Sequence, residues 1–240
     1  MASTDMEADS TYQRIQENWA AVKDEVAQAA MQSGRKPDEV KVIGVTKYVD
    51  ATWTSWLYHS GCADLGENRP QVLWSKAETE GFPQEATWHM IGHLQTNKVR
   101  RLLRYQPIIH SVDSQRLLEI VAKESLANER STQVLLEVNV SRDASKTGLD
   151  PDTIELMMST DLPEGVEVVG LMAMAGLGGT EETAERQFHQ VRELRDRCSK
   201  LSGLEMRELS MGMSGDYQQA IAAGATMVRI GSRLFQGLLH

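Results

Sequence analysis

Short apolar segments alternate with segments of helix length along most of the chain. Eight segments rich in β-branched and other apolar residues predict strands, and they cover residues 41–46, 62–66, 88–91, 107–112, 133–140, 166–173, 207–211 and 226–230. Each is followed by a stretch with helical character. Eight strand-then-helix units in 240 residues fit a closed parallel barrel, whereas a doubly wound sheet normally uses fewer strands. The pattern therefore predicts an α/β fold, a single (β/α)8 TIM barrel.

An extra amphipathic helix is predicted before the first strand. Its apolar positions recur at spacings of four, three and four residues, at Ile15, Trp19, Val22 and Val26. Ser10 or Thr11 can cap its start, and we expect it to end near Gly34. Residues 1–9 are polar and acidic, so we expect a disordered tail there. No Pro/Gly/Ser linker divides the rest of the chain, which predicts one domain over residues 10–240.

Composition and charge narrow the classes of partner. A formal charge of -9 repels phosphate backbones and anionic membranes, so we expect no nucleic-acid or membrane partner. Cys62 and Cys198 have no metal-ligand spacing around them and are predicted to be reduced thiols. The start of the chain shows no targeting signal, and no apolar run approaches membrane-spanning length. We therefore expect a cytoplasmic monomer.

Polar residues follow several predicted strands, where a parallel barrel carries its catalytic and ligand-binding groups. Lys47 follows the first strand. The loops after the seventh and eighth strands contain Ser214 with Gly215 and Gly231 with Ser232, and loops at these positions often hold a phosphate through backbone N–H groups and small hydroxyls. An ordinary helix cap or turn explains either loop alone. The two loops together with the lysine favour a phosphate site.

A phosphate site that faces a strand-end lysine suits a ligand with both a phosphate and an aldehyde, and pyridoxal 5'-phosphate (PLP) is such a ligand. A desolvated lysine near a positive group loses proton affinity and becomes a competent amine for imine formation. Lys47 is therefore the predicted Schiff-base lysine. The alternative is a lysine whose ammonium group simply extends into water at the end of a buried strand.

Seven motifs resemble, in order and spacing, the pyridoxal phosphate homeostasis protein family. They are VIGVTKYV, LGENRPQ, WHMIGHLQTNK, HSVDS, EVNVSRDASKTGL, GLMAM and LSMGMSGDYQQAIAAGATMVRIGSRLFQG. The resemblance covers nearly everything from residue 40 to the C-terminus. It implies a single-domain barrel like the N-terminal domain of alanine racemases, PLP bound through the lysine that matches Lys47, and a role in vitamin B6 and amino-acid balance without an established reaction.

The resemblance also implies roles for further residues. Asn68 is expected beside the cofactor. Ser214, Gly231 and Ser232 are expected to hold its phosphate. Arg229 is expected to face the pyridine nitrogen, with a structural arginine in an ion pair as the alternative.

An arginine at the pyridine nitrogen bears on whether the protein is an enzyme. A guanidinium only donates hydrogen bonds, so it favours an unprotonated nitrogen and weakens the ring as an electron sink. We expect a PLP carrier or regulator with PLP-dependent apoenzymes as candidate partners, and we assign no catalytic residue.

A PLP-dependent amino-acid racemase-like enzyme is the alternative. It needs a proton donor opposite Lys47, which alanine racemases take from a second domain, and this chain ends eleven residues after Arg229. A Schiff-base aldolase would more usually carry its lysine on a later strand.

Other motifs are assigned structural roles. The histidines near apolar runs are predicted to be satisfied core or rim residues rather than bases, namely His89, His93 and His110. Residues 98–104 are predicted to form a helix with one solvated face and an apolar face of Val99, Leu102 and Leu103. The glycine cluster at 176–179 is predicted to be a turn before a helix at 181–201, and it is a weak second phosphate candidate.

Overall fold

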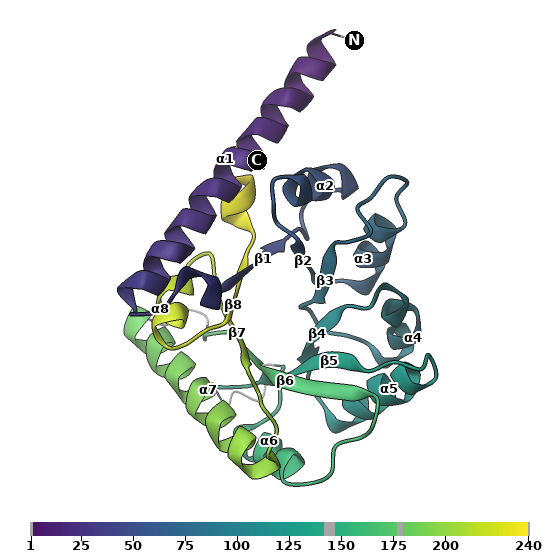
Figure 1. Cartoon of the computed structure of the whole chain (residues 1–240), viewed down its shortest axis with the longest axis vertical. Helices are drawn as coiled ribbons and strands as arrows, with labels where there is room; N and C mark the ends of the chain where they lie inside the picture. The colour runs from purple at the N-terminus through teal and green to yellow at the C-terminus, as the bar shows by residue number, and fades with distance from the viewer. Residues whose placement is uncertain (1, 142–146, 177–179, 240) are drawn as a thin grey trace.

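The computed structural model describes residues 2–141, 147–176 and 180–239, and it shows a closed barrel of eight parallel strands (Figure 1). The strands are β1 (Lys41–Val45), β2 (Asp64–Glu67), β3 (Thr87–Met90), β4 (Ile108–Val112), β5 (Thr132–Val138), β6 (Val166–Ala173), β7 (Glu208–Met213) and β8 (Met227–Ile230). Each strand pairs with the next in chain order, and β8 pairs with β1. The predicted barrel is confirmed, with every strand within about two residues of its predicted bounds.

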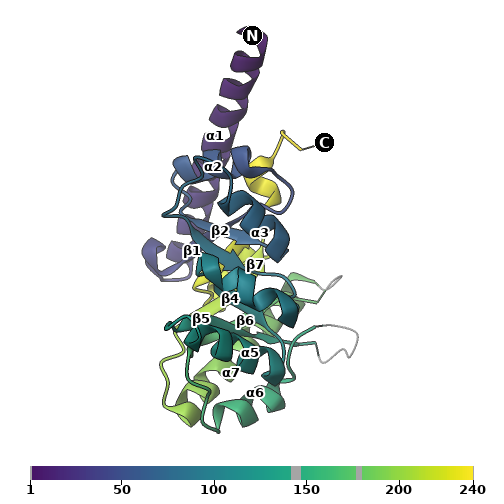
Figure 2. The ribbon, with the colours of Figure 1, turned by 90° about the vertical axis from the view of Figure 1, so that its right-hand side faces the viewer.

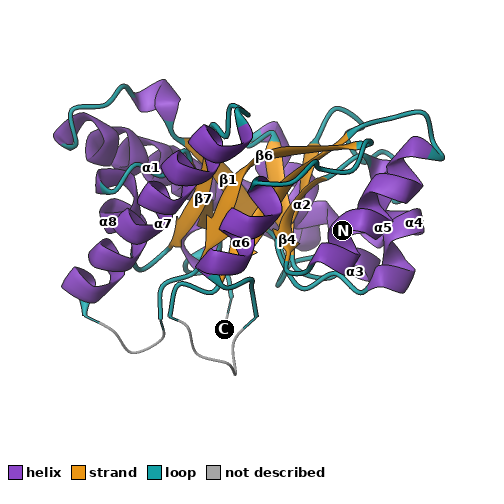
Figure 3. Ribbon diagram, turned by 90° about the horizontal axis from the view of Figure 1, so that it is seen from below, coloured by secondary structure: helices purple, strands orange, loops and turns teal. Residues whose placement is uncertain are grey.

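Helices surround the strands (Figure 3). The α-helices are α1 (Ala2–Gln32), α2 (Ala51–His59), α3 (Pro70–Ala77), α4 (Val99–Leu102), α5 (Gln115–Leu126), α6 (Pro151–Met158), α7 (Glu181–Ser202) and α8 (Tyr217–Ala222). The short 3-10 helices are η1 (Pro37–Glu39), η2 (Thr96–Lys98), η3 (Leu103–Tyr105) and η4 (Ser232–Phe235). The predicted helix at 181–201 is confirmed as α7. The glycine cluster before it falls largely outside the described residues.

The extra N-terminal helix is present, and it packs across the point where the barrel closes. Its predicted apolar positions, Ile15, Trp19, Val22 and Val26, are all buried, and α1 contacts α2, α8 and η4. The predicted start was wrong, because α1 begins at Ala2 and both Ser10 and Thr11 lie inside it. Residues 2–9 are part of the helical segment that extends beyond the barrel in Figures 1 and 2, and the disorder of residues 1–9 stays a prediction.

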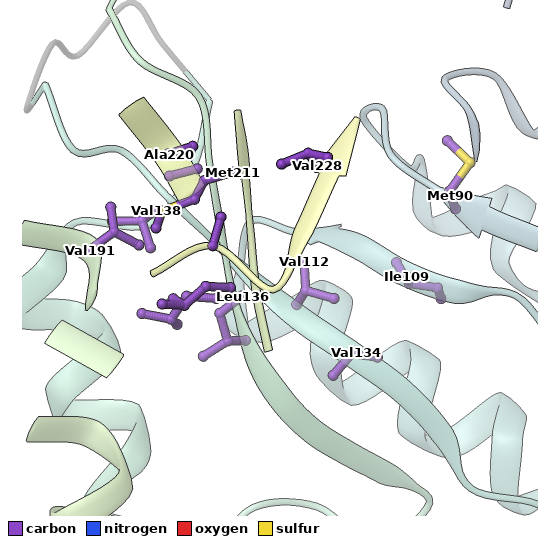
Figure 4. Close-up of a cluster of buried hydrophobic side chains, with 14 of the residues drawn as sticks. Met90, Ile109, Val112, Val134, Leu136, Val138, Val191, Met211, Ala220 and Val228 are labelled. Atoms are coloured by element: carbon purple, nitrogen blue, oxygen red, sulfur yellow. The ribbon is translucent and has the colours of Figure 1, made fainter. Parts of the chain in front are cut away.

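The main core lies between the barrel and its helices. Side chains that point outward from the strands are fully buried there, including Met90, Ile109, Val134, Leu136 and Val228 (Figure 4). Each such side chain contributes about 1.5–3 kcal/mol when it is removed from water. The apolar face predicted within residues 98–104 joins this core, since Val99, Leu102 and Leu103 are buried. This shell fixes the strands, whose ends carry the candidate site.

The inside of the barrel is divided into an apolar part and a polar part. Leu135, Val169 and Met172 form a small apolar cluster of their own. Elsewhere in the interior, Nδ1 of His110 on β4 is hydrogen-bonded to Oγ of Ser210 on β7 at 2.8 Å. Because β5 and β6 separate these two strands in the sheet, this hydrogen bond crosses the interior. TIM barrels are more usually filled by branched aliphatic side chains, so the polar part needs an explanation.

Both cysteines are free thiols, as predicted. Cys62 and Cys198 are buried, and burial raises the pKa of Cys62 to about 12 and that of Cys198 to about 11. These thiols therefore stay protonated and unreactive near neutral pH. Within the described ranges, we find no helix with the length and apolar character needed to cross a membrane.

Gly170 allows β6 and β7 to pair closely. A Cβ atom at this position would lie 1.8 Å from the carbonyl oxygen of Glu208, so the strands would have to separate. We expect Gly170→Ala to lower the free energy of unfolding by about 3 kcal/mol or more, measured by urea denaturation. The control is Gly215→Ala, where nothing lies within 4 Å of the added atom and a change below about 0.5 kcal/mol is expected. Equal effects of the two substitutions would contradict this packing.

Candidate functional site

Lys47 lies at the C-terminal end of the barrel, in the turn that follows β1. Its side chain is exposed, and its Nζ atom lies 4.8 Å from the centre of the Tyr48 ring. In the closed barrel β1 lies between β2 and β8. The turn that carries Lys47 is therefore flanked by the loops that follow these two strands.

A buried ion pair supports the backbone just before Lys47. The ammonium group of Lys76 lies 2.5 Å from Oε1 of Glu67 and donates a 2.7 Å hydrogen bond to the carbonyl oxygen of Thr46. The hydroxyl of Thr46 donates to the same carboxylate oxygen at 2.6 Å. Burial lowers the pKa of Lys76, and the charge of Glu67 opposes this shift. The pair fixes the peptide that precedes Lys47.

Sequence reasoning missed the structural role of this pair. Glu67 ends β2 and Lys76 lies near the end of α3, so their contact depends on how α3 packs on the barrel. Oε2 of Glu67 is buried, and it has no hydrogen-bond partner within the described part of the chain. The sequence signal was weak, because a lysine on an amphipathic helix is usually exposed.

Asn68 leaves the barrel at the same level as Lys47. Val45 pairs with Gly66, and the two side chains lie two residues beyond these partners. Asn68 is half-buried, and its backbone packs against Gly92, where an added Cβ would lie 2.3 Å from the Asn68 carbonyl oxygen. The loops after β2 and β3 are thus in contact, and Asn68 is held beside the turn of Lys47.

The structure brings the two predicted phosphate loops together. The Gly231 N–H donates a long 3.4 Å hydrogen bond to the hydroxyl of Ser214, so the loop after β8 contacts the loop after β7. Gly231 also packs on β1, since an added Cβ would lie 3.3 Å from the carbonyl oxygen of Val45. Ser232 is exposed at the start of η4. Together with the turn of Lys47, these groups line one side of the rim.

Arg229 lies inside the barrel below these loops and is only 4% exposed. Its Nη1 atom donates to the carbonyl oxygen of Ser210 at 2.7 Å and to the hydroxyl of Ser210 at 2.8 Å. Its Nη2 atom donates to the carbonyl oxygen of Ala173, the last residue of β6, at 3.0 Å. These bonds use three of the five guanidinium N–H donors, and the guanidinium reaches the C-terminal end of the barrel.

In the ranges that the structure describes, no carboxylate directly contacts the guanidinium of Arg229. Its contacts there are to carbonyl and hydroxyl oxygens, so the ion pair of the alternative interpretation is not found among the described residues. Burial lowers the pKa of Arg229 to about 10, and the charges of Asp216 and Glu137 oppose this shift. The guanidinium therefore remains charged near neutral pH, with donors available to a ligand.

The histidines lie as predicted in the core and at the rim. His89 and His110 are fully buried inside the barrel and hydrogen-bonded to each other. His93 is exposed, and its Nδ1 atom lies 2.9 Å from a carboxylate oxygen of Asp113. Among the residues that the structure describes, no histidine belongs to a group of three or more His, Cys, Asp or Glu side chains that could hold a metal ion.

The chemistry of this end of the barrel suits a small anionic ligand. It offers a primary amine on Lys47, hydroxyl and N–H donors on the last two loops, and a buried guanidinium. A cavity of about 610 Å³ lies at the opposite end, lined by residues at the strand starts such as Lys41, Glu208 and Met227. Since active sites of such barrels form at the C-terminal ends of the strands, we place the candidate site at the rim that carries Lys47.

Comparisons with known proteins agree on one group of relatives. Residues 11–238 match the family model for the alanine racemase N-terminal domain. The pyridoxal phosphate homeostasis protein of Aquifex aeolicus is 35% identical over 221 residues, which are 91% of this chain and 96% of the relative. The protein of the same name from Pseudomonas aeruginosa is 36% identical over 226 residues, covering 92% of this chain and 94% of the relative.

Solved structures show the same relationship. PipY of Synechococcus elongatus, solved with PLP bound, superimposes with a TM-score of 0.81 at 34% identity, covering 92% of this chain and 99% of that protein. Alanine racemase from Corynebacterium glutamicum has a TM-score of 0.71 at 15% identity, covering 95% of this chain and 63% of that enzyme. The second comparison shows a shared barrel fold only.

The buried pair behind Lys47 gives a stability prediction. Lys76→Met would leave the carboxylate of Glu67 buried without its cation, so we expect a loss of about 3–5 kcal/mol in the free energy of unfolding, measured in urea at neutral pH. Adding Glu67→Gln should restore part of the loss. The control is Lys123→Met on an exposed position of α5, for which we expect a change below about 0.5 kcal/mol. A loss as small as that of the control would show that the pair is solvated.

Proposed function

Because the chain belongs to the pyridoxal phosphate homeostasis protein family, we propose that it binds PLP in the cytoplasm and serves in vitamin B6 homeostasis and amino-acid balance. The observation that carries this proposal is the convergence at one end of the barrel of an exposed lysine, two contacting hydroxyl and glycine loops and a buried guanidinium. The PLP found in PipY, at 34% identity, supports the choice of ligand.

The donor set fits the functional groups of PLP. Lys47 supplies the primary amine that holds the aldehyde carbon as a Schiff base, with the carbonyl oxygen leaving as water. Ser214 and Ser232 donate their hydroxyls to the phosphate. Gly231 adds its N–H, because its 3.4 Å bond to Ser214 is long enough to be exchanged for a stronger bond to an anion. Asn68 flanks the bound ring.

Arg229 sets the character of the site. Bound PLP supplies an electron sink that is strongest when its pyridine nitrogen is protonated. A guanidinium donates a hydrogen bond to that nitrogen and favours its unprotonated form. This weakens the electron sink and favours storage of PLP over carbanion chemistry.

The position of Lys47 also favours delivery. Its side chain is exposed, so an amine from another molecule can approach the Schiff-base carbon and displace the lysine. We therefore propose that the protein acts as a monomeric carrier that exchanges PLP with PLP-dependent apoenzymes.

The first test concerns the lysine. Sodium borohydride treatment of the PLP-loaded protein should fix a pyridoxyl group on Lys47, located by peptide mass spectrometry, and Lys47→Ala should abolish this adduct. Lys123→Ala, at an exposed position of α5, should leave the adduct unchanged. A reduced adduct on Lys41 or Lys76 of the unmodified protein would contradict the assignment.

The second test concerns the phosphate loops. Ser214→Ala and Ser232→Ala should each weaken the binding of PLP more than the binding of pyridoxal, measured as dissociation constants. Each lost hydrogen bond to an anion is worth about 1.5–3 kcal/mol. Pyridoxal serves as the control because it has no phosphate. Equal weakening of both ligands would mean that these serines act only on the structure of the loops.

A further inference from the structure

One chain of hydrogen bonds crosses the interior of the barrel and ends at Arg229. Nε2 of His89 lies 2.9 Å from Oδ1 of Asp64, and Nδ1 of His89 lies 2.9 Å from Nε2 of His110. Nδ1 of His110 lies 2.8 Å from Oγ of Ser210, which accepts from Arg229 at 2.8 Å. The chain links β2, β3, β4, β7 and β8, and both histidines and Ser210 are fully buried.

The far end of the chain fixes the direction of the first bond. Asp64 begins β2 at the N-terminal end of the barrel, and its Oδ1 atom also lies 3.1 Å from the ammonium group of Lys41. Burial alone would raise the pKa of Asp64, but the hydrogen bond from His89 and the positive charge of Lys41 lower it overall. An ionised carboxylate only accepts hydrogen bonds, so Nε2 of His89 carries the proton.

The remaining directions follow one after another. Burial lowers the pKa of both histidines, with that of His110 well below its ordinary value, so each ring is neutral. Nδ1 of His89 is then an acceptor, and the Nε2–H group of His110 donates the hydrogen bond to it. Nδ1 of His110 is likewise an acceptor, and the hydroxyl of Ser210 donates to it. Every donor in the chain thus meets an acceptor.

This arrangement constrains Arg229. The hydroxyl hydrogen of Ser210 is committed to His110, so the lone pairs of that oxygen are available to the guanidinium. The guanidinium is then held by two oxygens of Ser210 and by the carbonyl of Ala173. Rotating it would leave buried polar groups unpaired, which is costly in a region of low dielectric constant.

We propose that Asp64, His89, His110 and Ser210 are positioning residues that hold Arg229 in one orientation, with its remaining N–H donors directed to the pyridine nitrogen of PLP. The proposal rests on the proposed function, because PLP is the ligand that supplies this nitrogen. It assigns a role to the polar part of the barrel interior, which neither the Schiff base nor the phosphate site requires.

The first experiment measures the chain directly in the unmodified full-length protein without ligand. Nitrogen-15 NMR distinguishes protonated from unprotonated imidazole nitrogens. At neutral pH, both His89 and His110 should be neutral with the proton on Nε2. A protonated ring, or a proton on Nδ1 of either residue, would overturn the proposal.

The second experiment separates positioning of Arg229 from general stability. Ser210→Ala removes the link between His110 and Arg229, so we expect PLP to bind about 3- to 10-fold more weakly, the size of one neutral hydrogen bond. An analogue of PLP with a C–H group in place of the ring nitrogen should bind both proteins equally. The control is Ser125→Ala. It removes a buried hydroxyl that bonds to Thr132 and takes no part in the hydrogen bonds to Arg229, so the dissociation constants of PLP and of the analogue should not change.

The outcomes are distinct. Equal weakening of PLP and of the analogue by Ser210→Ala would overturn the positioning role, as would no weakening of PLP. If the unmodified protein bound neither ligand, the proposed function itself would fail, whatever the NMR result.

Discussion

Pairing of the first strand with the last is the constraint on which the rest of this structure depends. Ile43 pairs with Arg229 and Gly44 with Ile230. These pairs close the barrel, although the paired residues are far apart in the sequence. The closure places the turn of Lys47 beside the loop of Gly231. The N-terminal helix secures the same region from outside, since Glu25 of α1 binds both Arg233 and Tyr217. An open sheet with the same strands would separate the lysine from the anion-binding loops.

The polar interior is a second consequence of closure. A guanidinium buried without a contacting carboxylate is normally disfavoured, because desolvation of a charge is costly. Here carbonyl dipoles and the hydroxyl of Ser210 solvate it. The chain of hydrogen bonds that begins at Arg229 reaches a negative charge only at Asp64. This carboxylate lies at the opposite end of the barrel. The interior therefore gives up some aliphatic packing in order to hold one cation in a defined place.

The two supports of the candidate site act on different parts of it. The Lys76–Glu67 pair lies between β2 and α3 and fixes the peptide before Lys47. The chain from Asp64 to Ser210 lies inside the barrel and constrains Arg229. Lys47 itself is exposed, and its Nζ atom lies over the ring of Tyr48. A supported frame around an exposed amine is the arrangement that the proposed holding and release of a cofactor requires.

The sequence by itself determined the elements and most of the rim. Strand and helix positions follow from local periodicity, and residues that follow a strand of a parallel barrel must lie at one end. The local pattern and the family motifs are therefore enough to name candidate site residues, which are Lys47, Asn68, Ser214, Arg229, Gly231 and Ser232. The start of α1 was misjudged because Ser10 and Thr11 are good caps but do not prevent a helix from continuing through them.

Only the tertiary structure decided the contacts inside the barrel. Asp64, His89, His110 and Ser210 come from four different strands, and no local pattern predicts that their side chains meet. Their hydrogen bonds depend on the register and closure of the whole sheet, which bring together side chains that the sequence leaves far apart.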